Sequence, residues 1–474
     1  MTEVLPSLAG ILLFLLPGLG LTELIPPLRT LPLPRRLGYS FLLGLTAVAG
    51  ALYIGSHLFG LPLRRMEILA VAAVMVGVGL SSLGWGKGRR SGLPQPRATP
   101  WVIGEGTRWH RATVALLAFI SLGLFADAVT NPVTGWDGRM IWSAQARYLR
   151  AAGTVDAPVL REARWFVSHP RYPLLLPVAQ AAVSELVGAD EDRHVFRAVY
   201  AMFFPALLLI LWDGAVRWAG APAARLACLA AAGSSAFTFW QDGGAASAYS
   251  DLPLGCLTGA ALVLLLRSRR SVAGAVTAGI FLAGAVLSKN EGTLLAFFIP
   301  LAAVPLLLRR QDRRRQAARL LAAVIPPLLA LAFLASWRAG IPNRYDEGYT
   351  GFVTLGTFWP GAVTRIPLLA RLALRQMLSW DPWAAFWWIA PPALAVGWRG
   401  LRGRRCPLAM TLILAAAAPL AIAWGAYSVH WNPATLLRVT WTRFLLQGSL
   451  PFLLLLALTL RDLLLSRKLA RNSH

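Results

Sequence analysis

Long apolar runs, separated by short polar segments, make up most of the chain. They lie near residues 7–25, 38–58, 67–84, 111–128, 196–216, 224–240, 252–266, 272–288, 293–309, 319–337, 383–398, 408–425 and 445–461. A helix that spans a bilayer takes ~17–25 apolar residues, and each run is at or near that length. The pattern predicts an all-α polytopic membrane protein with about thirteen transmembrane helices.

The composition favours the same class. Of the 474 residues, 57% are hydrophobic and 14% are charged, whereas a soluble domain carries roughly 25% charged residues. A net charge of +25 would suggest a nucleic-acid partner for a soluble protein. Here the basic residues form short runs between apolar segments, as positive-inside sorting predicts, so we expect no nucleic acid. The three cysteines are far apart, which predicts neither a disulfide framework nor a cysteine metal site.

The charged residues predict the orientation of the chain. If each apolar run crosses once, the basic runs share one side, which is then cytoplasmic. They lie at residues 35–36, 87–90, 217–225, 267–270, 309–319, 399–405 and 467–468. Most acidic residues fall on the outer side, namely Asp127, Asp137, Asp156, Glu162, Asp190, Glu191, Asp192, Asp242, Asp251, Glu291, Asp346, Glu347 and Asp381. This arrangement requires that residues 172–187 do not cross, and we expect a helix lying at the membrane interface there.

The largest polar insert divides the chain into regions. Residues 1–110 are predicted to form amino-terminal membrane helices and a basic cytoplasmic linker. Residues 111–461 form a core that includes a long outer loop at 129–195, and residues 462–474 form a basic cytoplasmic tail. Ordinary connections are ~4–6 residues long, so this loop is longer than a connection requires. Inside it, a polar face that includes Arg139 opposes an apolar face, which predicts a short amphipathic helix at the membrane surface.

Asp137 is the first candidate for chemistry. It lies between two glycines and next to Trp136, just beyond an apolar run. A partly desolvated carboxylate at that depth has a raised proton affinity and suits a general base acting on an alcohol. The alternative is that Asp137 caps the surface helix that follows, since aspartate is a favoured N-cap residue. Both interpretations remain open from the spacing.

Three further candidates, the carboxylates Asp251 and Glu291 and the amine Lys289, lie in later outer loops. Asp251 lies at the start of an apolar run, where it either caps the helix or faces a cavity rather than lipid. Lys289 breaks the positive-inside trend on the acidic side. It either pairs with Glu291 or another carboxylate, or binds a phosphate as a point charge.

The last outer loop adds arginines among tryptophans. Arg438 and Arg443 either belong to an interfacial aromatic belt or clamp a phosphate in bidentate fashion, and His430 precedes them. His169 is a lone histidine without zinc-like spacing, which favours a structural role or a hydrogen bond to a sugar or phosphate. A divalent ion held between Asp137 and Asp251 remains open, but no cofactor is expected.

Together, these loop motifs resemble those of the GT-C fold glycosyltransferases. The motifs are Trp136-Asp137, His169-Pro170-Arg171-Tyr172-Pro173-Leu174, Tyr249-Ser250-Asp251-Leu252-Pro253, Ser288-Lys289-Asn290-Glu291-Gly292, and His430 with Arg443. They are similar in order and side to those of the bacterial protein mannosyltransferase and aminoarabinose transferase group, over roughly residues 111–461. Two features differ from the family pattern. Three extra amino-terminal spans precede the core, and, unlike in oligosaccharyltransferases, no large soluble carboxy-terminal domain is expected after it.

The resemblance implies an active site at the outer face. Asp137 would be the catalytic carboxylate, Asp251 would shape the acceptor or metal region, and Lys289, Arg443 and Arg438 would bind the lipid phosphate. The implied activity is hexosyl or pentosyl transfer from a polyprenyl-phosphate sugar to a lipid, glycan or protein acceptor. Inversion, a bacterial inner membrane and a periplasmic or extracellular active site are expected. The alternative is a polytopic transporter or lipid-linked sugar flippase, in which charges line a path.

Overall fold

The computed structural model describes residues 3–86, 108–188, 195–268, 271–307, 313–343, 355–397, 401, 406–430 and 432–472, and these ranges are helical without a strand. The helices are α1 (Val4–Glu23), α2 (Pro26–Arg29), α3 (Leu33–Phe59), α4 (Arg65–Gly86), α5 (Arg108–Thr130), α6 (Ala144–Ala152), α7 (Leu175–Val187), α8 (Arg197–Ala201), α9 (Phe203–Ala219), α10 (Ala221–Ala232), α11 (Asp251–Arg267), α12 (Val272–Ser288), α13 (Asn290–Leu307), α14 (Arg313–Ala339), α16 (Leu355–Thr364), α17 (Ile366–Met377), α18 (Trp380–Trp383), α19 (Phe386–Gly397), α20 (Cys406–Val429), α21 (Pro433–Gln447) and α22 (Ser449–Asn472). A π-helical turn, η1 (Gly138–Ser143), and four 3-10 turns, η2 (Pro158–Arg161), η3 (Ala163–Ser168), η4 (Ser235–Phe237) and η5 (Ala245–Ser247), complete the set.

Each predicted apolar run contains a helix. Within the described ranges, six helices are long and apolar enough to cross a membrane, or seven if α21 and α22 count as one span bent by 59°. Five further apolar helices have 10–17 residues. The all-α polytopic membrane class is therefore confirmed. The candidate spans differ more in length than the run pattern predicted.

Two predicted spans are much shorter than the apolar runs that suggested them. The run at 224–240 holds most of α10, which stops at Ala232, and the short turn η4. There the hydroxyl groups of Ser234 and Ser235 donate hydrogen bonds to the carbonyl oxygen of Pro382, at 3.1 and 2.9 Å. These bonds hold the segment that follows α10 against the turn at Pro382. The run at 383–398 holds α19, a helix of 12 residues.

Helix α7 occupies the segment that was predicted not to cross. Its 13 residues reach about 20 Å at 1.5 Å per residue, less than the ~30 Å hydrocarbon core. Residues 175–183 are all buried, and α7 packs against α6, α3 and α1. A helix that lies at the interface without crossing therefore stays a prediction. This helix is packed inside the protein, because nearly every side chain of its first half is apolar.

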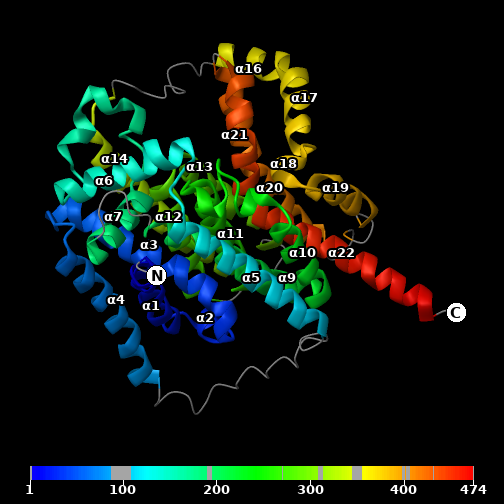
Figure 1. Cartoon of the computed structure of the whole chain (residues 1–474). Helices are drawn as coiled ribbons and strands as arrows, with labels where there is room; N and C mark the ends of the chain where they lie inside the picture. The colour runs from blue at the N-terminus through cyan, green and yellow to red at the C-terminus, as the bar shows by residue number, and fades with distance from the viewer. Residues whose placement is uncertain are drawn as a thin grey trace.

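The amino-terminal helices pack tightly onto the rest of the chain. A Cβ atom at Gly18 of α1 would lie 1.7 Å from the carbonyl oxygen of Ser40, and one at Gly44 of α3 would lie 1.8 Å from that of Phe14. Only glycine permits this close approach, which is typical of helix pairs in membranes. Helix α3 also packs on α7 and α9, so α1 and α3 are joined to the core. In Figure 1 the amino-terminal helices lie at one end, and α22 projects from the other.

Several predicted features lie outside the described residues. They are the basic linker after Gly86, the acidic residues 190–192 and 346–347, parts of the basic runs at 309–319 and 399–405, and Trp431. Helix α22 runs to Asn472, beyond the predicted start of the cytoplasmic tail at 462.

Candidate active site

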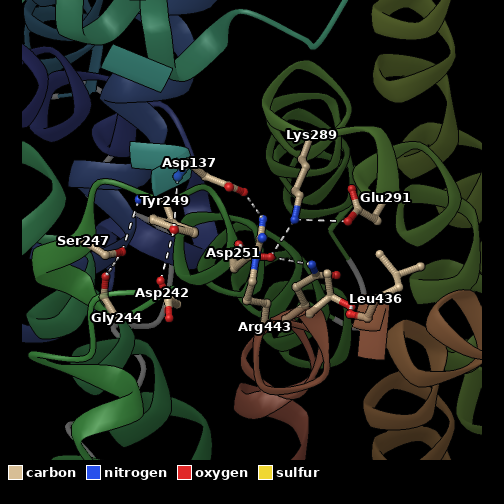
Figure 2. Close-up of polar contacts among 12 residues, drawn as sticks. Asp137, Asp242, Gly244, Ser247, Tyr249, Asp251, Lys289, Glu291, Leu436 and Arg443 are labelled. Carbon is tan, nitrogen blue, oxygen red and sulfur yellow. Dashed lines mark hydrogen bonds and ion pairs between the residues drawn. The ribbon is translucent and has the colours of Figure 1, made fainter. Parts of the chain in front are cut away.

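Five of the predicted site residues meet in one continuous chain of ion pairs. Arg443 Nη2 lies 2.8 Å from Asp137 Oδ2, and Arg443 Nε lies 2.9 Å from Asp251 Oδ2. Lys289 Nζ lies 2.6 Å from Asp251 Oδ1 and 3.1 Å from Glu291 Oε1. Figure 2 shows Asp137 at one end of the chain and Glu291 at the other. We call these five residues the ion-pair chain.

The ion-pair chain is assembled from the ends of several helices. Asp137 precedes η1 in the long loop after α5, and Asp251 is the first residue of α11. Lys289 is the single residue between α12 and α13, and Glu291 lies in the first turn of α13. Arg443 lies near the end of α21, just before the bend into α22. The charge pattern predicted all of these loops on one side, and the structure brings their charged residues into contact.

A tight break between two helices directs Lys289 toward Asp251. Lys289 has an extended backbone, with φ −161° and ψ 153°, while the residues on both sides are helical. A Cβ atom at Gly292 would lie 1.9 Å from the carbonyl oxygen of Ala285, so α12 and α13 approach closely there. The two helices therefore hold the ammonium group at their common end.

Burial varies along the ion-pair chain. The exposed fraction of the side chain is 0% for Asp251, 5% for Lys289, 11% for Arg443, 19% for Glu291 and 20% for Asp137. The centre is closed to solvent and both ends are reachable. A reactant that enters the site meets Asp137 or Glu291 before it meets Asp251.

Gln447 belongs to the site and was missed from the sequence. Its Nε2 donates a 2.8 Å hydrogen bond to Asp251 Oδ1, and its own Oε1 is buried without a hydrogen-bond partner among the described residues. Gln447 follows Arg443 by four positions, so both side chains project from one face of α21. That spacing was the available signal, but Gln447 lies inside the run read as a membrane span.

Tyr249 and Asp242 are a second omission, although both lie in a loop that the sequence singled out. The backbone N–H of Asp137 donates to the Tyr249 hydroxyl oxygen at 3.1 Å, and that hydroxyl donates to Asp242 Oδ1 at 3.2 Å. The guanidinium carbon of Arg443 lies 5.0 Å from the centre of the Tyr249 ring. Burial, with the charge of Asp137 next, raises the pKa of Tyr249 above its ordinary value, so the phenol keeps its proton. Tyr249 thus fixes the backbone position of Asp137.

A buried arginine ties the first outer loop to the second. Arg197 Nε donates to the carbonyl oxygen of Ala246 at 2.6 Å, and Nη1 donates to those of Asn131 at 2.7 Å and Asp127 at 3.0 Å. Its Nη2 pairs with the Asp127 carboxylate at 2.7 Å. One side chain therefore joins the end of α5 to the segment before Tyr249.

The glycines beside Asp137 are required by the same contact between loops. A Cβ atom at Gly135 would lie 2.3 Å from the carbonyl oxygen of Gln241, and one at Gly138 would lie 2.4 Å from that of Ser247. Backbone atoms cannot move aside as a flexible side chain can. Both glycines therefore let the Asp137 loop lie directly on the second outer loop.

We expect Gly138→Ala to destabilise the protein by about 1–3 kcal/mol and to lower its activity, because the added methyl group separates the two loops. Thermal unfolding and the activity assay described below would measure both effects. Gly77→Ala is the matched control, since nothing lies within 4 Å of a Cβ at that helical position. Equal behaviour of the two variants would show that the loops do not depend on this close contact.

Several alternatives left open by the sequence are settled by these contacts. Asp137 occupies the N-cap position of η1 without a capping hydrogen bond from its side chain, and the N-cap residue of α11 is Ser250 rather than Asp251. Lys289 pairs with Glu291 and also with Asp251. The position between Asp137 and Asp251, where a divalent ion was considered, holds the Arg443 guanidinium instead. Within the described residues, no three His, Cys, Asp or Glu side chains group as a metal site would require.

The other four predicted site residues have different surroundings. His169 stacks on Tyr172, with ring centres 4.8 Å apart, and Arg338 donates to the carbonyl oxygen of Arg171 in the same turn. Arg338 also bonds Asn290, the neighbour of Lys289, so this turn is tied to the site through one side chain. His430 Nδ1 accepts the N–H of Asn432. The two remaining residues, Arg139 in η1 and Arg438 in α21, are exposed.

Comparison with known proteins gives one similar structure. No protein-family model matches the chain, and no curated protein matches it. The chain is similar to the archaeal oligosaccharyltransferase AglB from Archaeoglobus fulgidus, solved in complex with an inhibitory peptide and a dolichol-phosphate. The sequences are 15% identical, the TM-score is 0.43, and the match covers 77% of this chain and 52% of that chain. This chain thus spans about half the length of that protein. The GT-C resemblance of the loop motifs stays a prediction.

Proposed function

We propose that this protein is an integral membrane glycosyltransferase. It would move a sugar from a polyprenyl-phosphate carrier to an acceptor hydroxyl at the outer face of a bacterial inner membrane. The observation that carries the proposal is the ion-pair chain, in which Asp137, Arg443, Asp251, Lys289 and Glu291 meet at the ends of apolar helices. The resemblance of the same loops to GT-C enzymes supports it.

The energetics of the ion-pair chain favour a functional origin. Ionisable residues within membrane helices are rare, and they usually pair with one another or face a cavity. A buried ion pair seldom stabilises a protein more than apolar residues of equal volume would. Five ionisable residues from different parts of the chain meet here. A role in a reaction therefore explains their grouping better than a contribution to stability does. Their position at one end of the helices supports a reaction centre rather than a translocation path.

Asp137 is the proposed general base. Its carboxylate, partly exposed at the end of the ion-pair chain, would accept the proton of the acceptor hydroxyl. The acceptor oxygen would form a bond to the anomeric carbon as the bond from that carbon to the phosphate oxygen breaks. The lipid phosphate would leave with the electron pair. A single displacement of this kind inverts the anomeric centre.

Arg443 and Lys289 are the proposed phosphate-binding residues. Guanidinium carries five N–H donors and ammonium carries three, so each retains donors beyond the ion pairs described above. Asp251 binds one cation through each of its oxygens, which holds the two cations side by side. Preorganised donors of this kind stabilise charge that develops on a leaving group. Asp251 is thus a positioning residue, and exposed Arg139 is a further candidate for the phosphate.

The test is a donor panel on the purified protein in lipid. We expect radiolabelled sugar to leave one polyprenyl-phosphate donor and to appear on an added acceptor, with release of polyprenyl phosphate. Soluble nucleotide sugars carrying the same label are the control and should not react. The acceptor panel contains lipid, glycan and peptide hydroxyl compounds.

A transport assay distinguishes the proposed transferase from the alternative, a lipid-linked sugar flippase. Proteoliposomes loaded with the same labelled lipid would report movement of the sugar between leaflets. Movement of intact donor without any transfer or release of sugar would replace the transferase proposal with a flippase. Absence of donor binding across the whole panel would also defeat it.

A further inference from the structure

The proposed role of Asp137 conflicts with its contact in the structure. The proposed reaction needs its carboxylate to be available to an acceptor hydroxyl. In the structure that carboxylate is engaged by Arg443 at 2.8 Å. The oxygen atom that accepts this bond from the guanidinium is not available to the acceptor hydroxyl at the same time.

The two ion pairs of Arg443 differ in how easily they can be exchanged. The bond from Nε reaches Asp251, which is fully buried and is also held by Lys289 and Gln447. The bond from Nη2 reaches Asp137, which is one of the two most exposed members of the ion-pair chain. An entering anion therefore meets the outer pair first, while the inner pair keeps the guanidinium in place.

Within the ion-pair chain, carboxylates outnumber cations. The ion-pair chain contains three carboxylates, on Asp137, Asp251 and Glu291, and two cations, on Arg443 and Lys289. A phosphate that binds the remaining N–H donors of Arg443 comes to lie beside the Asp137 carboxylate, which Arg443 also binds. Like charges brought together in a poorly solvated site repel each other strongly.

The backbone of Asp137 can stay fixed while its side chain changes partner. Its N–H is bonded to the Tyr249 hydroxyl, and Gly135 and Gly138 rest directly on the second outer loop. Only the side-chain torsions of Asp137 need to change for the carboxylate to leave Nη2. The structure thus allows exchange without rearrangement of the loop.

We propose that Asp137 occupies the phosphate-binding position of Arg443 in the resting protein and is released as a base when the lipid phosphate of the donor displaces it. This inference rests on the proposed function. It assigns a gating role to the Asp137–Arg443 pair, because the carboxylate is free to bind the acceptor hydroxyl only after the donor has displaced it from Arg443. Acceptor deprotonation and donor binding are then coupled, so the base acts only when the donor phosphate is in place.

Binding of polyprenyl monophosphate, the carrier without sugar, tests this competition. The protein is placed in nanodiscs, and Kd is measured for the parent and for Asp137→Asn. Removing the competing charge is expected to lower Kd by about tenfold, which corresponds to roughly 1.4 kcal/mol. If Asp137 does not compete with the phosphate for Arg443, the Kd of Asp137→Asn equals or exceeds that of the parent, and the proposal is wrong.

Matched variants complete the experiment. Asp137→Glu keeps the competing charge and should bind like the parent, whereas Arg443→Gln should bind weakly. Asp156→Asn removes a carboxylate paired with His57 in the same outer loop, and its Kd should not change. Asp137→Ser provides a second neutral variant should the asparagine variant fail to fold.

The outcomes distinguish the two levels of the proposal. If the parent binds the probe and reacts with a donor, but the neutral variants bind no tighter, the gating role is overturned and the transferase function stands. If the parent binds neither the probe nor any donor, the function fails and the gating role fails with it.

Discussion

Asp137→Asn is expected to reduce sugar transfer by about a thousandfold, within the 10²–10⁴ range that general base catalysis contributes. Asparagine preserves the size of the side chain and can accept a hydrogen bond from Arg443, but it cannot accept the acceptor proton. The backbone bond from residue 137 to Tyr249 does not involve the side chain, so the loop should keep its position. The measurement is the initial rate of transfer at saturating donor and acceptor.

Asp156→Asn is the control for this result. Asp156 lies in the same outer loop, is also a partly exposed carboxylate, and pairs with His57 instead of the ion-pair chain. We expect its rate to stay within a factor of about three of the parent, as for a surface ion pair of modest value. A similar loss in both variants would mean that Asp137 acts through the fold. A parent-like rate for Asp137→Asn would remove it from the mechanism.

Asp251→Asn is expected to lower both stability and turnover. Asp251 is fully buried and binds Lys289, Arg443 and Gln447. Its neutral replacement leaves two buried cations with fewer partners, a change that costs about 3–5 kcal/mol when one member of a buried pair is removed. Transfer should also fall because the two phosphate-binding groups lose the carboxylate that orients them. Thermal unfolding in lipid and the transfer rate would measure the two effects.

A second substitution separates these two effects of Asp251. Adding Lys289→Met to Asp251→Asn removes one of the stranded cations and should recover part of the lost stability, since buried ion pairs often tolerate joint replacement by apolar residues. It should not recover transfer, because a proposed phosphate ligand is gone. Recovery of both would show that Asp251 and Lys289 serve only the fold.

The sequence predicted the helices well because their signal is local. Apolar runs of spanning length are decided within a window of neighbouring residues, and each of them contains a helix. The charge asymmetry also predicted which loops share a side, and the contacts of Asp137, Asp251 and Lys289 agree with that grouping. Lys289 was singled out because it broke the trend, and the structure supplies the partners that such an exception requires.

What the sequence missed depends on contacts between distant parts of the chain. Arg443 and Asp251 are separated by 192 positions, and nothing in either loop specifies that pairing or excludes the metal site considered in its place. Gln447 was concealed in an apolar run because the 59° bend at Gly448 interrupts what looked like a single span. The segment after α10 likewise has a remote partner, since the carbonyl group of Pro382 accepts hydrogen bonds from the hydroxyl groups of Ser234 and Ser235.

The Arg197 side chain has a consequence for how the site moves. Because it binds backbone carbonyls at Asp127, Asn131 and Ala246 at once, neither outer loop can detach without breaking bonds to the other. Segments linked in this way open and close as one cooperative unit of local unfolding. The Asp137 loop therefore does not open as a lid independently of the Tyr249 segment. It and the Tyr249 segment form a single linked wall of the site.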